Sequence, residues 1–177
     1  MAFVTASWFF VKKSEVFYLY IKIASIIAFG LFLYAAIISV FWVAQNNKQA
    51  ISTVLGVLLS ITIFFLTQSS QQSLDPKLLD LSQHAENAWA FWNGLSQYGH
   101  NLVVGSLMSV SCLAIAVFLS ILMGIYTVWS YISQSETGDS LILSFLMPFR
   151  IDRGGILAFI FCFIAWLFQS GLLFRLV

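Results

Sequence analysis

The chain has 177 residues, of which 60% are hydrophobic and 8% are charged, and its formal net charge is +1. Soluble domains carry roughly 45–50% apolar and about 25% charged residues, so this composition excludes a soluble fold and predicts lipid around much of the surface. The balanced charge excludes the basic surface that nucleic acid requires, so we expect no nucleic-acid partner.

The charged residues gather in short polar stretches that separate four apolar segments. The sequence therefore predicts a single membrane domain over residues 1–177. Its fold class is an all-α, polytopic integral membrane protein with four transmembrane helices and one or two interfacial amphipathic helices. The predicted spans are about 17–44, 50–66, 102–132 and 156–173.

The first eleven residues are apolar and precede Lys12 and Lys13, which is the reverse of the order in a cleavable signal peptide. We expect residues 2–10, which contain Trp8, to lie at the membrane interface, where aromatic rings are favoured. Lys12 and Lys13 would then contact lipid headgroups or a partner. Lys22 lies one turn inside the first span, so its ammonium is expected to reach back to the headgroups.

The polar residues 45–49 predict a tight turn between the first two spans, which would make those helices antiparallel neighbours. Residues 68–73 read as a loop after the short second span. Asp75 and Pro76 have the pattern of an N-cap followed by the first helical position.

The following stretch predicts one amphipathic helix at about 76–93, lying in the membrane interface. Its charged and amide side chains lie on the face opposite to the apolar side chains. Trp89 and Trp92 are expected to contact lipid headgroups or a partner. The apolar face is predicted to comprise Leu78, Leu81, Ala85, Ala88, Trp89 and Trp92.

The third span, 102–132, is longer than a bilayer requires, and a polar stretch follows it. Within that stretch Arg150 and Arg153 are expected to contact lipid headgroups or a partner. With four spans, the side of the two termini collects five Lys and Arg residues and the other side three. This excess predicts cytoplasmic N- and C-termini, with a bacterial inner membrane as the expected location.

Small residues recur at helical spacing in every span, and such stripes allow the backbones of membrane helices to approach closely. Gln169 is the strongly polar member of these stripes, and we expect it to hydrogen-bond to a neighbouring helix. The spacing leaves open whether the stripes meet within one chain or between chains. The predicted helix-packing residues are Ser52, Gly56 and Ser60; Gly105, Ser109, Cys112, Ala116 and Ser120; and Gly155, Ala158, Cys162 and Gln169.

The sequence contains no hydrolase, metalloprotease or nucleotide-binding motif, so we expect no catalytic, cofactor or metal site. We therefore expect a non-catalytic structural or assembly subunit of a larger membrane complex, such as a secretion or conjugation apparatus. Its partners would be the lipid bilayer and either other membrane subunits or further copies of itself. One alternative is an oligomeric channel or small-solute transporter. Another is a membrane enzyme that uses the 75–100 region, with Asp75, Asp80, His84, Glu86 and His100.

Overall fold

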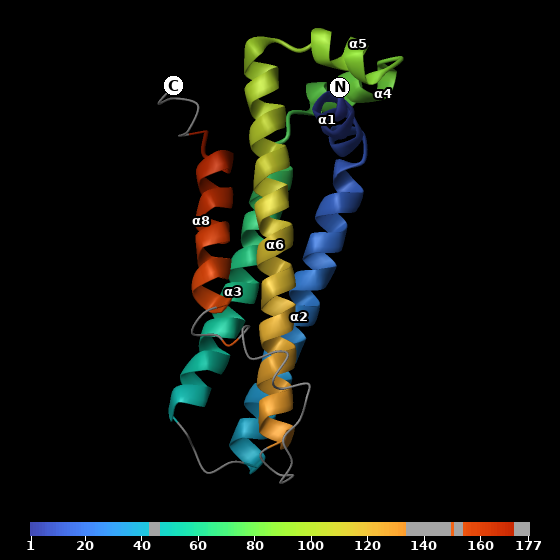
Figure 1. Ribbon diagram of the computed structural model, residues 1–177. Coiled ribbons are helices and arrows are strands. Elements are labelled where there is room, and N and C mark those ends of the chain that lie inside the picture. The colour runs from blue at the N-terminus through green and yellow to red at the C-terminus, as the bar shows by residue number, and fades with distance from the viewer. Residues whose placement is uncertain (43–46, 134–149, 151–153, 172–177) are drawn as a thin grey trace.

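The computed structural model describes residues 1–42, 47–133, 150 and 154–171, and every regular element in these residues is a helix. Three long helices form the body of the molecule (Figure 1). They are α2 (Ser14–Trp42), α3 (Asn47–Gln72) and α6 (Gln97–Ser133). The shorter helices are α1 (Ala2–Lys12), α4 (Pro76–His84), α5 (Ala88–Asn93) and α8 (Ile156–Gln169).

Each of the three long helices contains a stretch that is long and apolar enough to cross a membrane. The stretches are Ser14–Ser39, Ile51–Gln72 and Gln97–Ile132. At a rise of about 1.5 Å per residue, each exceeds the roughly 30 Å of a bilayer core. The described residues therefore form an all-helical protein with three membrane-spanning candidates.

The second long helix extends further than the sequence predicted. The sequence predicts a span at 50–66 and a loop at 68–73, but α3 continues to Gln72. Serine, threonine and glutamine do not break a helix, and the Thr67 hydroxyl donates to the Ile63 carbonyl inside it, 2.7 Å away. The helix ends only before Asp75 and Pro76.

The first and third spans agree with their predicted positions to within a few residues. α2 begins at Ser14, ahead of the predicted residue 17, and the last two predicted residues, 43–44, lie outside the described part of the chain. α6 begins at Gln97, five residues before the predicted start at 102. Both extensions are helical turns that contain polar residues, so the limits of the apolar run do not reveal where these helices begin.

The predicted amphipathic helix at 76–93 is wrong as a single element, because the structure divides it into α4 and α5. Asp75 caps α4 by accepting from the Lys77 N–H, and Asn87 caps α5 by accepting from the Ala90 N–H. Between them Ala85 is extended, so the helical register is lost. The predicted face changes as a result: Phe91 is fully buried, whereas Trp89 is 55% exposed.

The segment predicted as the fourth span is, in its described part, the 14-residue helix α8. This length gives about 21 Å, which is short of a bilayer core. α8 lies alongside the middle part of α6 (Figure 1). Residues 172–173 of the predicted span lie outside the described part, so the fourth crossing stays a prediction.

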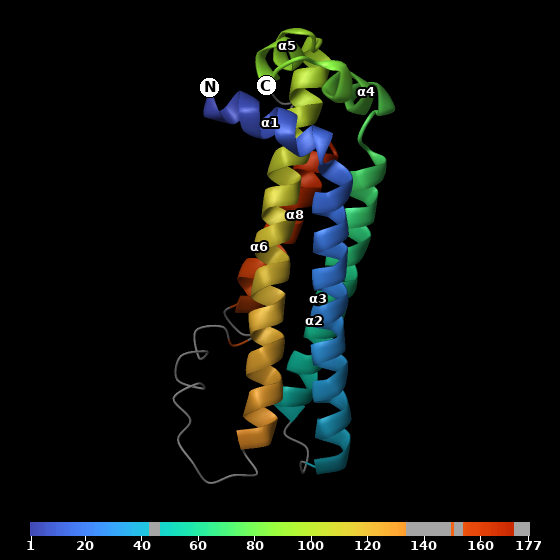
Figure 2. The ribbon, with the colours of Figure 1, turned by 90° about the vertical axis from the view of Figure 1, so that its right-hand side faces the viewer.

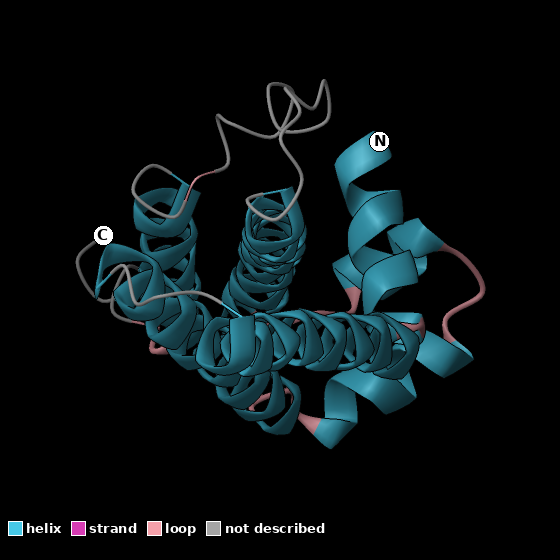
Figure 3. Ribbon diagram, turned by 90° about the horizontal axis from the view of Figure 1, so that it is seen from below, coloured by secondary structure: helices cyan, strands magenta, loops and turns pink. Residues whose placement is uncertain are grey.

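α1, α4 and α5 form a cap at one end of the bundle. Lys13 alone separates α1 from α2, and the chain bends there so that α1 runs across the direction of the long helices (Figure 2). Seen from the opposite end, α1 lies to one side of the bundle (Figure 3). α1 packs against α4 and α5, and the Trp8 indole donates to the Ser82 carbonyl at 2.9 Å.

Candidate functional site

The contact between α2 and α3 is built on a glycine. The ring of Phe32, which is fully buried, lies against Gly56, and a Cβ atom at that position would overlap the ring. One turn further along α3, Ser60 Oγ lies 3.3 Å from Ser120 Oγ of α6. Of the residues predicted to pack from α3, Gly56 and Ser60 are buried and Ser52 is half-buried.

The predicted stripe of α6 is mostly withdrawn from the surface. Gly105, Ser109, Ala116 and Ser120 are buried and Cys112 is half-buried. Further along the same helix, Gly124 approaches α2 so closely that an added Cβ atom would lie 2.9 Å from the Leu31 Cβ. The side chains that α6 uses for packing therefore face its neighbours α2, α3 and α8.

The small face of α8 turns toward the same helix. Gly155, Ala158 and Cys162 are buried, and α8 packs mainly on α6. Cys162 belongs to the buried core of the molecule, and Cys112 of α6 packs against that core. The small-residue faces of α6 and α8 thus meet within one chain, a question that the sequence left open.

Gln169, at the end of α8, hydrogen-bonds to α3: its Nε2 donates to Ser69 Oγ. A second polar contact joins α2 to the same end of α3, because the Tyr18 hydroxyl lies 3.0 Å from Ser70 Oγ. Lys22 also reaches this end, and its Nζ donates to Gln71 Oε1 at 2.7 Å. Tyr18 and Lys22 share a face of α2 at helical spacing, but nothing in the sequence marks Ser70 and Gln71 as their partners.

The residues predicted to meet headgroups or a partner lie in different surroundings. Lys12 stands over the ring of Trp8, 4.7 Å from its centroid, and Lys13 is exposed between α1 and α2. Trp89 is exposed on the cap. Arg150 is exposed just before α8, and Arg153 lies outside the described residues.

Trp92, by contrast, is largely engaged within the chain. Its ring contacts Phe3 at 5.8 Å and His100 at 4.4 Å between ring centroids. His100 Nε2 also lies 3.0 Å from the Trp92 carbonyl. Trp92 therefore holds α1, α5 and the start of α6 together.

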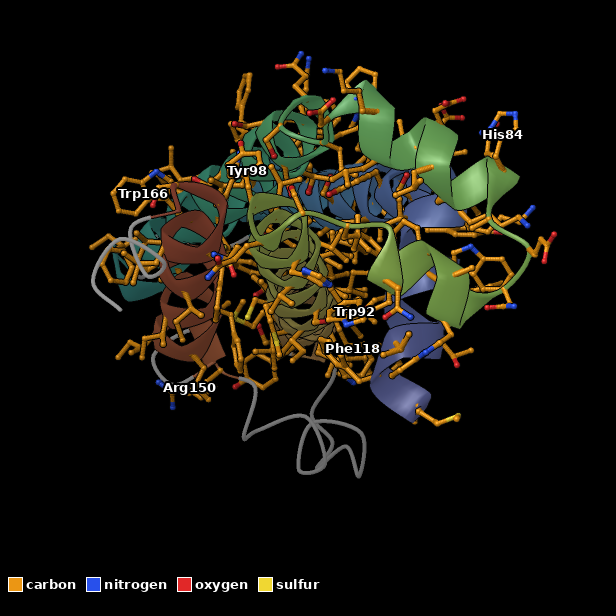
Figure 4. All side chains as sticks on the ribbon, turned by 90° about the horizontal axis from the view of Figure 1, so that it is seen from above. His84, Trp92, Tyr98, Phe118, Arg150 and Trp166 are labelled. Atoms are coloured by element: carbon orange, nitrogen blue, oxygen red, sulfur yellow. The ribbon has the colours of Figure 1, made fainter. Side chains whose placement is uncertain are left out.

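The acidic and histidine residues of the 75–100 region do not converge. His84 Nδ1 lies 3.2 Å from the Asp80 carboxylate, and both side chains are exposed. His84 points outward at the edge of the cap, away from Trp92 (Figure 4). Within the part of the chain that the structure describes, no three histidine, cysteine, aspartate or glutamate residues are placed to hold a metal ion.

Comparison of the chain with protein-family models, with curated proteins and with solved structures finds no match in any of the three.

Proposed function

We propose that this chain is a non-catalytic subunit of a larger membrane assembly, such as a secretion or conjugation apparatus. The observation that carries the proposal is how the polar groups inside the spans are used. Ser60 Oγ donates to the Gly56 carbonyl, and Thr127 Oγ1 donates to the Met123 carbonyl. Charged residues are absent from the stretches 23–47, 49–74, 101–135 and 154–174. These hydroxyls are thus satisfied by the backbone of their own helices, and Ser60 also meets Ser120 of the neighbouring helix, whereas relays and pumps place ionisable groups at membrane depth.

The same contacts favour packing over a path for solutes through one chain. A channel along the serine and threonine stripe requires its hydroxyls to face an open lumen. Ser60 and Ser120 instead face each other between α3 and α6, and both are almost fully buried.

The surfaces left for partners are the outward faces of the long helices and α8. Because the small-residue stripes are used within the chain, these outward faces are built from large apolar side chains. Phe163 and Trp166 stack at 5.9 Å on the outer side of α8. Representative exposed residues are Tyr34 of α2, Phe118 of α6 and Phe163 of α8.

We further propose four crossings, with both termini in the cytoplasm of a bacterium. In support, the end of α8 contacts the end of α3, beside the start of α2. Reporter fusions should therefore give a cytoplasmic signal when placed at either the N-terminus or the C-terminus. A C-terminal fusion that is active only outside the cytoplasm would contradict the four crossings.

The assembly role predicts protein neighbours at the outward faces. A photo-crosslinking phenylalanine analogue should join the chain to another membrane protein, or to a second copy, from at least one of positions 34, 118 and 163. The matched control is position 32, because Phe32 is fully buried and can react only within the chain. The adducts are identified by mass spectrometry after reaction in native membranes. Adducts to lipid alone at all three outward positions would contradict the proposal.

A further inference from the structure

A cleft of about 370 Å³ lies between the C-terminal ends of α3 and α8 and the first turns of α6. This volume falls in the range of small-molecule sites. The cleft is lined by Ser70, Ser73, Tyr98, Asn101, Leu102, Gly105, Ser106, Phe168, Gln169, Ser170 and Gly171.

The polar side chains of the cleft are hydroxyls and amides, and none of the described residues that line it is charged. Burial of a charged group without an opposite charge is costly. A neutral ligand is therefore favoured over an ionic one. Hydroxyl and amide groups can both donate and accept, so they match a ligand that carries several hydroxyls.

Gln169 provides an unused acceptor in this wall. Its Nε2 donates to Ser69, while Oε1 is buried and has no hydrogen-bond partner among the described residues. A buried acceptor without a donor destabilises the structure that contains it. The terminal torsion of glutamine is broad, so the amide can turn toward the cleft. One ligand hydroxyl then donates to Oε1 and a second accepts from Nε2 in place of Ser69, which leaves a net gain of one hydrogen bond.

The position of the cleft suits an amphiphile. α3 and α8 end beside it while α6 continues toward the cap (Figure 1), so it lies near the end of the apolar stretches. Leu102 and Phe168 supply apolar wall, and Tyr98 lies at the rim beside the ends of these helices (Figure 4).

We propose that this cleft binds an uncharged group that carries several hydroxyls. Two sources share this chemistry: the sugar or glycerol part of a neutral lipid headgroup, and a free polyol in the adjacent water. The proposal uses the membrane location of the chain but does not require its assembly role, so either can fail alone.

The test uses the full chain in nanodiscs that contain phosphatidylcholine, phosphatidic acid and monoglucosyl diacylglycerol in equal amounts, with retained lipids counted by native mass spectrometry. The glucolipid should be retained about fivefold more than either phospholipid, as expected for the net gain of one hydrogen bond. Ser106→Leu, which fills the cleft, and Gln169→Leu, which removes the acceptor, should each abolish this preference. Ser111→Leu is the matched control, since Ser111 lies on the same helix but is exposed.

Competition by excess methyl glucoside distinguishes the two sources. Displacement of the glucolipid supports a site for free polyols, and no displacement supports a site for the lipid. Equal retention of the three lipids by the original chain, or a preference for phosphatidic acid, would overturn the proposal. A glucolipid preference that survives Gln169→Leu would overturn it as well, even if Ser106→Leu fails to fold.

Discussion

Replacement of Gly56 by leucine is expected to separate α2 from α3 and to lower the stability of the folded chain by at least about 2 kcal/mol. The ring of Phe32 occupies the space where a Cβ atom would stand, and Phe32 is itself fully buried. The ring therefore cannot move aside without displacing its other neighbours, since protein interiors are close-packed.

Gly30→Leu is the matched control for this prediction. Gly30 lies on α2, is exposed, and has open space where a Cβ would be added. Thermal unfolding in detergent can be followed with a thiol-reactive dye, because Cys162 is buried and Cys112 is half-buried until the helices separate. Similar melting temperatures for the Gly56→Leu and Gly30→Leu variants would contradict the packing described for Phe32.

Replacement of Phe91 by alanine is expected to release the cap from the bundle. Phe91 is fully buried, in the same core cluster as Phe10 and Leu78 of α1 and α4. Truncation of a buried phenylalanine typically lowers stability by about 3–5 kcal/mol. Helices as short as α4 and α5 are not stable on their own in water, so they cannot offset this loss. Protease added on the cap side should then cleave residues 76–96 at least about tenfold faster, since local opening admits the protease.

The control for Phe91 lies two residues away. Trp89→Ala removes a larger ring, but one that is 55% exposed, so cleavage of the cap should stay close to that of the original chain. If the Trp89 variant were cleaved as fast as the Phe91 variant, the cap would not be held by the buried ring.

The sequence predicted the features that depend on local pattern. Long apolar runs predicted the three long helices, and the Asp75–Pro76 pair predicted the start of α4. Among the small residues at helical spacing, Gly56 and Ser60 are buried, whereas Ser52 and Cys112 are half-buried. The spacing of apolar residues and the size of each residue are local properties of the sequence, so they can be recognised without knowing the fold.

The features that the sequence did not predict depend on competition between local structures or on contacts between residues far apart in the sequence. The break between α4 and α5 follows from Asn87, whose side chain caps a new helix in place of continuing the old one. The amphipathic pattern of 76–93 fits a single helix equally well, so the pattern alone could not show the break. Tyr18 meets Ser70 across 52 positions and Gln169 meets Ser69 across 100, and no local signal pairs residues so far apart.

The length of α6 has a consequence for how the protein can be reached. Its 37 residues extend for about 55 Å. Even at a tilt of about 40°, the upper end of the usual range, more than about 10 Å of this helix stands outside a 30 Å hydrocarbon layer. The chain thus presents rigid helical surface at the level of the lipid headgroups, where a peripheral protein can dock without entering the hydrocarbon.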